Sequence, residues 1–167
     1  EKFVIFDYCG NFEFFSITPA GYAPSEKFSI THRLFMVKSE IVRALQDIRY
    51  IGNPELEQYR NSLITSLIVQ IKRLDRENFV VRNHLKYYDL YKSEDAWAVL
   101  QEKQITELSM HIAPIVLPTN ADDAAKLLDY LMYTIEFKLL TAGSIRRGMK
   151  RVQEIAQKLS KLGTIPQ

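Results

Sequence analysis

Apolar and polar residues alternate along most of the chain with the period of amphipathic helices. From about Ser29 onwards, apolar residues recur every three or four positions, which makes one side of a helix apolar. The first such stripe consists of Leu34, Val37, Ile41, Leu45 and Ile48. Gly52, Asn53 and Pro54 then suit the end of one helix and the start of the next. We therefore expect a tight helical hairpin, whose second helix runs from Pro54 to about Leu74 and sits centrally because its apolar arc is wide.

The middle of the chain predicts shorter helices, followed by a long one. A short helix is expected in the stretch "FVVRNHLKYYDLY", another begins after Ser93, and a third covers about Gln104 to Ile112. Thr119 stands three residues before Asp122, which is close to a capping box, and a long helix from there should reach about Thr141. Its inward face is predicted to consist of Ala124, Leu127, Leu128, Leu131, Ile135 and Leu139.

A last amphipathic helix is predicted from Ser144 to Leu162, after Gly143 ends the long one. At about 100° per residue, its apolar side consists of Ile145, Met149, Val152, Ile155, Ala156, Leu159 and Leu162. The basic residues Arg147, Lys150, Arg151, Lys158 and Lys161 lie on the opposite side. The fold class that follows is mainly α, with about five to seven helices packed as a bundle-like domain over residues 26–167.

The opening stretch "EKFVIFDYCGNFEFF" has the character of a strand instead. Its apolar run consists of Phe3, Val4, Ile5 and Phe6, which are β-branched or aromatic. A lone strand leaves its backbone N–H and C=O groups without partners, so either "FEFFSIT" pairs with it or its sheet lies on sequence outside this chain. We expect Phe3–Tyr8 to be extended and poorly covered, so that deletion of residues 1–15 leaves the melting temperature nearly unchanged. The prolines of "TPAGYAPSEK" indicate a linker before the first helix.

Composition is typical of a globular protein of one domain. The chain has 167 residues, of which 47% are hydrophobic and 25% charged. Its apolar runs are too short to span a membrane, and the start does not have the pattern of a secretory signal. Cys9 is the only cysteine, which excludes an internal disulfide and fits a reducing compartment. We therefore predict a cytoplasmic protein without a membrane partner.

The basic charge is concentrated in the last predicted helix. The net charge of the chain is +2, but residues 144–162 alone carry +5, which leaves −3 for the rest. Glu154 is the only acidic residue in that segment. Local charge of this kind suits a polyanion or an acidic protein surface, whereas the default interpretation of any such stripe is a solvated helix face.

Motifs of known catalytic or cofactor sites are absent from the sequence. It contains no phosphate-binding loop, no Gly-x-Gly-x-x-Gly turn and no His-Glu-x-x-His zinc helix. Cys9 could pair with His32, His84 or His111, but a small thiol packed at the end of an apolar strand is the better interpretation. Glu136 and Lys138 have the spacing of half a nuclease motif. They fall within a predicted helix, however, where residues two apart point in different directions.

The aromatic and basic stretch around His84 allows two interpretations. Its histidine and tyrosines could stack on the bases of a single-stranded nucleic acid. A partly buried aromatic belt with polar tips at the surface is favoured. We therefore assign no catalytic, cofactor-binding or metal-binding residue to this chain.

Several stretches resemble the R subunit of type I restriction-modification enzymes of the EcoEI-like kind. The opening matches that family's Phe-Asp-Tyr-x-x-Asn-Phe-x-x-Phe pattern, which follows the last helicase motif. The matching residues are Phe6, Asp7, Tyr8, Asn11, Phe12 and Phe15. "HIAPIV" resembles the middle of the family's C-terminal region, and "AKLLDYLMYTIEFKLL" and "IAQKLSKLGTIPQ" resemble its last long helices.

The resemblance implies a place in a larger enzyme. Residues 1–25 would be the last strand of the second RecA-like motor domain with a linker, and residues 26–167 the C-terminal helical domain, truncated at its end. The parent subunit would be an ATP-dependent endonuclease and helicase that translocates and cleaves DNA, with its ATP and magnesium sites upstream of Glu1. The helical domain would couple the motor to the methyltransferase and specificity subunits and is a candidate for contact with double-stranded DNA. The alternative is a free-standing helical adaptor for a protein partner, unrelated to restriction.

Overall fold

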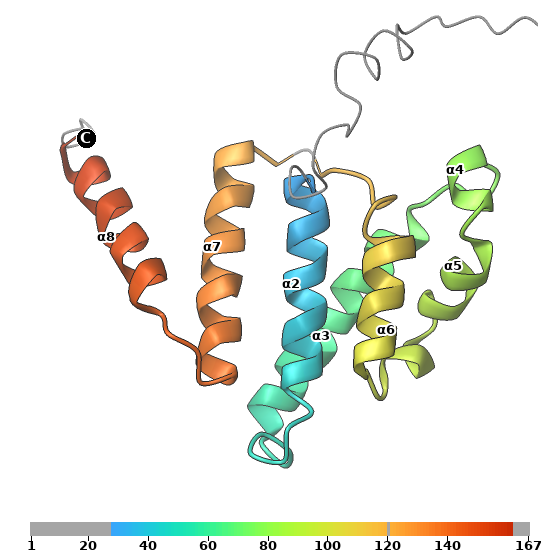
Figure 1. Ribbon diagram of the computed structural model, residues 1–167, viewed down its shortest axis with the longest axis horizontal. Helices are drawn as coiled ribbons and strands as arrows, with labels where there is room; N and C mark the ends of the chain where they lie inside the picture. Colours follow the sequence, from blue (N-terminus) through green and yellow to red (C-terminus); the bar gives the residue numbers. More distant parts are fainter. Residues whose placement is uncertain (1–27, 120, 162–167) are drawn as a thin grey trace, which may run out of the picture.

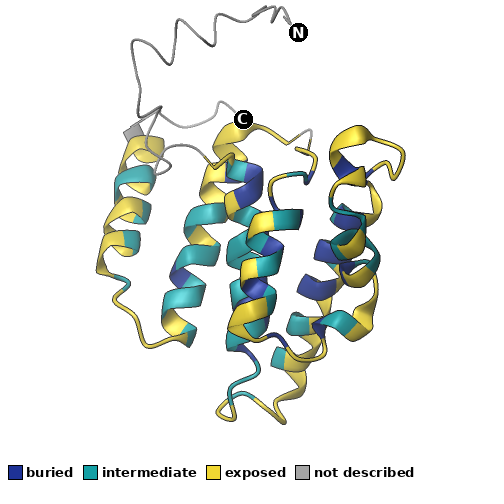
Figure 2. Ribbon diagram, turned by 45° about the vertical axis from the view of Figure 1, so that its right-hand side comes forward, coloured by how far each residue is buried: buried dark blue, intermediate teal, exposed yellow. Residues whose placement is uncertain are grey.

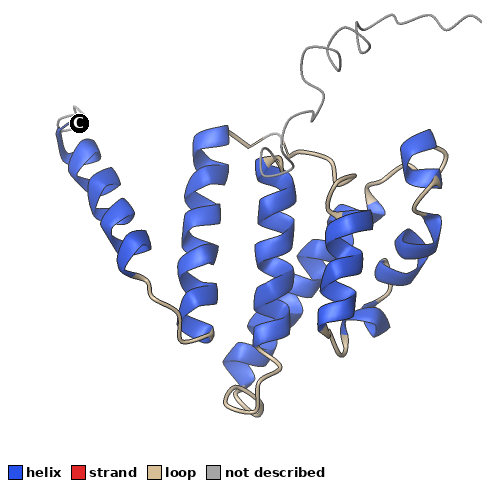
Figure 3. Cartoon of the chain, in the orientation of Figure 1, coloured by secondary structure: helices blue, strands red, loops and turns tan. Residues whose placement is uncertain are grey.

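The computed structural model describes residues 28–119 and 121–161, which form helices and loops without a strand (Figure 3). The expected mainly helical fold is therefore confirmed for this part of the chain. Its seven α-helices are α2 (Ile30–Ala44), α3 (Pro54–Lys72), α4 (Phe79–Arg82), α5 (Leu85–Tyr91), α6 (Glu102–Glu107), α7 (Asp123–Leu140) and α8 (Arg146–Lys161). A 3₁₀ turn at Glu94–Trp97 and a π turn at Leu108–Ile112 complete the elements.

The segment predicted as a strand, Phe3–Tyr8, lies outside the described residues, as does the linker that follows it. The same holds for all six residues of the family pattern and for Cys9. The strand, its motor-domain origin and the packing of the Cys9 thiol therefore stay predictions.

Helix α2 occupies the centre of the fold. It contacts α3, α6, the π turn and α7, and it lies between α7 and α6 in Figure 1. Helix α3 contacts α2, α5 and the 3₁₀ turn. Helix α3 is therefore packed by several neighbours, as its wide apolar arc predicted. The most connected helix is nevertheless α2, which is buried on more than its predicted stripe, because Phe35, Ser39 and Val42 are buried as well.

The start of α3 follows the sequence signals closely, whereas other helix ends differ from them. Asn53 Oδ1 accepts hydrogen bonds from the backbone N–H groups of Glu55 and Leu56 at 3.0 and 3.3 Å. Gly52 has a φ of 84°, a conformation that favours glycine. Helix α2, however, already ends at Ala44, so the loop between α2 and α3 is longer than expected. Ile48 lies in this loop and is 85% exposed.

The ends of α7 also differ from the prediction. Its N-cap is Asp122, without a side-chain cap bond, so the capping box predicted at Thr119 was wrong. At the other end, Ala142 has the positive φ of 54°, and Gly143 donates its backbone N–H to the carbonyl of Lys138. The left-handed residue thus comes one position before the glycine expected to end the helix.

Trp97 anchors the core between α2, α3 and the short helices. Its side chain is fully buried, and its Nε1–H donates to the carbonyl of Tyr91 at 2.9 Å. The two rings meet edge to face with their centroids 5.9 Å apart. The guanidinium of Arg60 donates to the carbonyls of Val42, Trp97 and Ala98 at 3.1, 2.7 and 3.2 Å. Arg60 therefore ties α3 to α2 and to the 3₁₀ turn.

Helix α7 packs on α2 with a different face from the one predicted. Tyr133, Phe137 and Leu140 pack against the core, while Arg33 and Lys38 of α2 lie over the rings of Tyr130 and Tyr133. Of the predicted inward stripe, Ile135 alone is buried, Leu131 is half-buried and the others are exposed. The physical reason is that α7 is apolar on two sides, and the aromatic side removes more surface from water when it packs on α2.

Candidate docking surface

The leucine side of α7 and the apolar side of α8 form an exposed apolar surface. Six large apolar side chains on these two helices are each 44–63% exposed, and all but Leu127 lie on these two sides. We define the α7–α8 face by these residues: Leu128, Met132, Leu139, Met149 and Leu159. The three on α7 fall within about 40° of arc at 100° per residue, so they form one row. Scattered exposed apolar residues are normal, but a row on two adjacent helices is typical of an interaction site.

Helix α8 meets the rest of the fold at α7. No side chain from Arg146 to Ser160 is buried, and Figure 2 shows α8 as exposed or intermediate in burial. The two helices approach closely at Gly148, where a Cβ atom would lie 2.5 Å from Cγ1 of Ile135. Glycine is therefore required at this position for close packing, although it lowers the helix propensity of α8. On the apolar side of α8, Ile145, Val152 and Ile155 are half-buried, whereas Met149 and Leu159 are exposed.

We expect Gly148→Ala to weaken the packing of α8 on α7. Alanine gains roughly 1 kcal/mol of helix propensity over glycine. The overlap with the buried Ile135 side chain costs about 1–3 kcal/mol. The amide hydrogens of α8 should therefore exchange faster with solvent than in the unmodified protein. Because Ile135→Ala removes the clashing atoms, the double variant should be more stable than the sum of the two single changes predicts. Additive effects would contradict the contact.

The predicted basic side of α8 is exposed. Arg147, Lys150, Arg151 and Lys158 all lie at the surface, and Lys161 is the last residue of the helix. Glu154 lies on the same side and pairs with Arg151, with Nη1 and Oε2 3.2 Å apart. An exposed pair of this kind stabilises the helix by at most about 1 kcal/mol. Within the described part of the chain, Arg147, Lys150 and Lys158 form no ion pair, so the helix presents a basic border beside the α7–α8 face.

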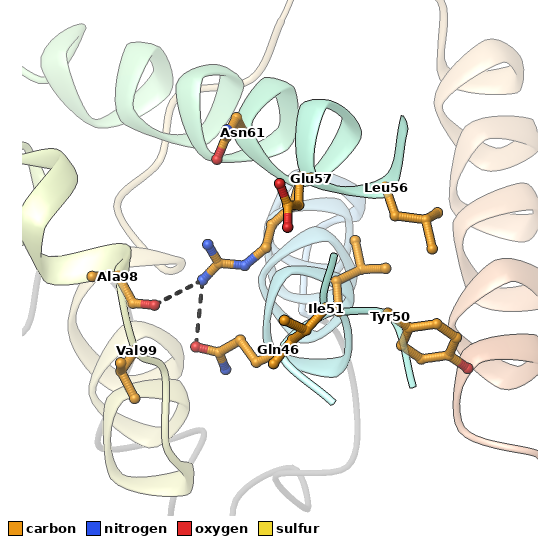
Figure 4. A pocket seen from close by; sticks show the side chains of 10 residues that line it. Gln46, Tyr50, Ile51, Leu56, Glu57, Asn61, Ala98 and Val99 are labelled. Carbon is orange, nitrogen blue, oxygen red and sulfur yellow. Dashed lines mark hydrogen bonds between the residues drawn. The ribbon is translucent and has the colours of Figure 1, made fainter. Parts of the chain in front are cut away.

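A pocket of about 530 Å³ lies between the end of α2, the start of α3 and the segment after the 3₁₀ turn (Figure 4). Its polar side chains already bind groups of the chain itself. Arg60 donates to Gln46 and Ala98, as the dashed lines show, and Glu57 accepts from the backbone N–H of Gly52 at 3.1 Å. The pocket therefore serves the packing of the fold, and its polar groups do not converge on a ligand.

Glu136 and Lys138 lie within α7, as the sequence predicted. The carboxylate of Glu136 accepts a hydrogen bond from the Tyr59 hydroxyl at 2.9 Å. Burial and this carboxylate raise the pKa of Tyr59, and burial raises the pKa of Glu136. The pair joins α3 to α7, so the role of Glu136 is structural.

The aromatic belt around His84 has the favoured, packed form. The ring of His111 stacks on Tyr87 with the centroids 3.8 Å apart and the planes 5° from parallel. This face of Tyr87 is therefore occupied by the protein itself. The sequence did not predict that His84 and His111 lie side by side, because 27 residues separate them and only the fold brings them together.

Within 28–119 and 121–161, no group of three or more His, Cys, Asp or Glu side chains could hold a metal ion. The resemblance places the ATP and magnesium sites of the parent upstream of Glu1, outside this chain.

Comparison with protein-family models, with curated proteins and with solved structures finds no match for this chain. None of the helices that the structure describes has the length and apolar character needed to cross a bilayer. The geometry of the chain itself therefore carries the functional argument. The sequence predicted that the basic residues of α8 lie at its surface, which is confirmed for Arg147, Lys150, Arg151 and Lys158. It missed the α7–α8 face, for which the available signal was that α7 has two apolar sides.

Proposed function

We propose that this chain is a non-catalytic helical docking module that binds a protein partner through the α7–α8 face. The observation that carries this proposal is the row of large apolar side chains left exposed on two adjacent helices. The basic border of α8 indicates the chemistry of the partner. It is an apolar protein surface with acidic residues around it, because opposite charges at the rim favour association and orient the two proteins.

The partner that best fits the sequence resemblance is the methyltransferase–specificity core of a type I restriction-modification enzyme. In this proposal the chain is the C-terminal helical domain of the R subunit, in the cytoplasm. The strand proposed at Phe3–Tyr8 completes the sheet of the second motor domain. ATP-dependent translocation and cleavage of DNA belong to the upstream domains of the parent, and the helical domain transmits force between motor and core. The support for this assignment is the opening pattern together with the stretches that resemble the family's last helices.

A free-standing helical adaptor would use the same α7–α8 face. All five residues of the face belong to this chain, so the face does not depend on the motor domains of a parent subunit. The gene distinguishes the two functions. The R-subunit assignment requires a helicase sequence directly upstream of Glu1 in the same reading frame. A start codon immediately before Glu1 would contradict it and leave the adaptor, with docking through the same face.

The basic side of α8 is proposed as a second contact, to double-stranded DNA. We expect weak binding that is indifferent to sequence, because phosphate contacts position a protein without reading bases. Each phosphate contact contributes about −0.9 to the slope of log affinity against log salt. The triple change Arg147→Gln, Lys150→Gln and Arg151→Gln should therefore make the slope less negative by up to about 2.7. Fluorescence anisotropy with a short labelled duplex at several salt concentrations measures it.

A matched control removes the same amount of charge elsewhere. Lys72, Arg73 and Arg82 are exposed on α3, at its C-cap and on α4, and their change to glutamine should leave the slope close to that of the unmodified protein. If the unmodified chain shows no salt-dependent binding to duplex DNA at low ionic strength, the DNA contact is wrong. The basic border would then serve the protein partner alone.

A further inference from the structure

His84 and His111 face each other across the short helices. Their Nδ1 atoms lie 3.2 Å apart, and their ring centroids are 5.3 Å apart with the planes at 50°. A separation of this size between two ring nitrogens means that the nitrogens point at each other. These are two of the three histidines in the chain, and they come from separate elements, the N-terminus of α5 and the π turn.

Both rings are held in place by the surrounding fold. The backbone carbonyl of His84 accepts hydrogen bonds from the N–H groups of Tyr87 and Tyr88, both at 2.9 Å. The ring of His111 is fixed by its stacking on Tyr87. The backbone around His111 is a π turn, in which Ala113 N–H donates to the carbonyl of Leu108 at 2.8 Å. Turns of this kind insert one extra residue into a helix, change the direction of the side chains and recur at functional sites.

The pair is suited to binding a proton or a metal ion between its nitrogens. Two neutral imidazoles can form one Nδ1–H···Nδ1 hydrogen bond, in which one ring donates and the other accepts. In a neutral imidazole one ring nitrogen carries a lone pair, and this lone pair is the one that binds a metal ion. When the donor ring carries its proton on Nε2 instead of Nδ1, both rings stay neutral and both Nδ1 lone pairs are available to one divalent ion.

We propose that His84 and His111 form a binding site for a divalent ion of the late first-row transition metals, with zinc as the ion bound in a cell. At a metal–nitrogen distance of about 2.0–2.1 Å, two nitrogens 3.2 Å apart subtend roughly 100° at the ion, near the tetrahedral angle. Imidazole nitrogen is a good ligand for zinc, copper and nickel, whereas magnesium and calcium require oxygen ligands. Water fills the two remaining positions, because no third His, Cys, Asp or Glu of the described residues joins the group.

The consequence of binding is a link between two parts of the fold that are far apart in sequence. Helices α4 and α5 lie at the end of the molecule opposite α8 (Figure 1), and the bound ion would fasten α5 to the π turn. Two protein ligands give a weaker site than the four of a structural zinc finger. The ion therefore stabilises a fold that already exists, rather than creating it. This site is independent of the α7–α8 face.

The test uses the full chain without a histidine tag and with Cys9→Ser, so that no thiolate competes for the metal. Isothermal titration calorimetry with zinc at pH 7.5 is expected to show one ion bound per chain. His84→Asn and His111→Asn should each reduce the affinity at least about tenfold, because each leaves one imidazole. His32→Gln is the matched control, since His32 lies on α2, and it should bind zinc like the parent. Circular dichroism verifies that each variant is folded.

Electron paramagnetic resonance of the copper(II) complex gives an independent measurement, the number of coordinated imidazole nitrogens. Two coordinated imidazole nitrogens are expected in the parent chain and one in His84→Asn. The proposal is overturned if zinc does not bind, or if binding is unchanged in both His84→Asn and His111→Asn. It is also overturned if the copper spectrum shows a single imidazole in the parent.

Discussion

Replacement of Trp97 by alanine is expected to lower the free energy of unfolding by about 3–5 kcal/mol. The side chain is completely buried, so its loss leaves a large cavity where the 3₁₀ turn packs on α3 and α5. It also leaves the carbonyl of Tyr91 without its donor and disturbs the 3₁₀ turn held by Arg60. Urea unfolding followed by circular dichroism measures the change, because Trp97 is the only tryptophan available for fluorescence.

Two further variants give this measurement its reference points. Trp97→Phe keeps an aromatic ring but loses the Nε1–H donor, so its loss of stability should be smaller than that of Trp97→Ala. Val99 lies two residues away and is mostly exposed, so Val99→Ala should change the free energy of unfolding by less than about 0.5 kcal/mol. A loss below about 1 kcal/mol for Trp97→Ala would contradict the position of this residue in the core.

The double change Leu128→Glu and Met132→Glu is expected to weaken binding of the proposed methyltransferase–specificity core at least about 30-fold. Important residues at the centre of an interface contribute roughly 2 kcal/mol or more to the free energy of binding. A loss of about 2 kcal/mol corresponds to a roughly 30-fold increase in Kd. A carboxylate introduced there must also be desolvated against an apolar surface. Both side chains are about half exposed in the chain alone, so its own stability should change little. Calorimetric titration of the core with each form of the chain measures the effect.

Phe79 provides the matched control for this experiment. It is a large apolar residue that is 79% exposed on α4, at the opposite end of the molecule from α8 (Figure 1). Phe79→Glu should bind the core as the unmodified chain does. If Phe79→Glu weakens binding and the α7 double variant does not, the docking face has been assigned to the wrong end of the fold.

Local chemistry made parts of the fold predictable. The start of α3 is an example, because three residues there have strong conformational preferences of their own. Gly52 has no side chain and adopts a positive φ, Asn53 caps the helix, and Pro54 occupies its first turn. The helical period also indicated most helices to within a few residues. Ala142 was not predictable in the same way, because glycine is the usual left-handed residue and Gly143 stood next to it.

Contacts between segments that are distant in the sequence were harder to predict. Helix α7 carries a leucine side and an aromatic side, and a periodic pattern cannot decide which of two apolar sides meets α2. The tyrosine-rich side does so, with Arg33 and Lys38 over its rings, which leaves the leucine side in solvent. The His84–His111 pair depends on the π turn, for which the sequence gives no recognised signal. The candidate docking face and the candidate metal site both arose from such contacts.

Hydrogen exchange of the chain with and without the methyltransferase–specificity core tests docking through the α7–α8 face most directly. Saturating core is expected to slow exchange in α7 and α8, at residues 123–140 and 146–161, because the partner covers the exposed row and restrains α8. Exchange in α4 and α5 should stay the same, since they lie at the far end of the fold. Unchanged exchange throughout, or protection confined to α4 and α5, would contradict docking at this face.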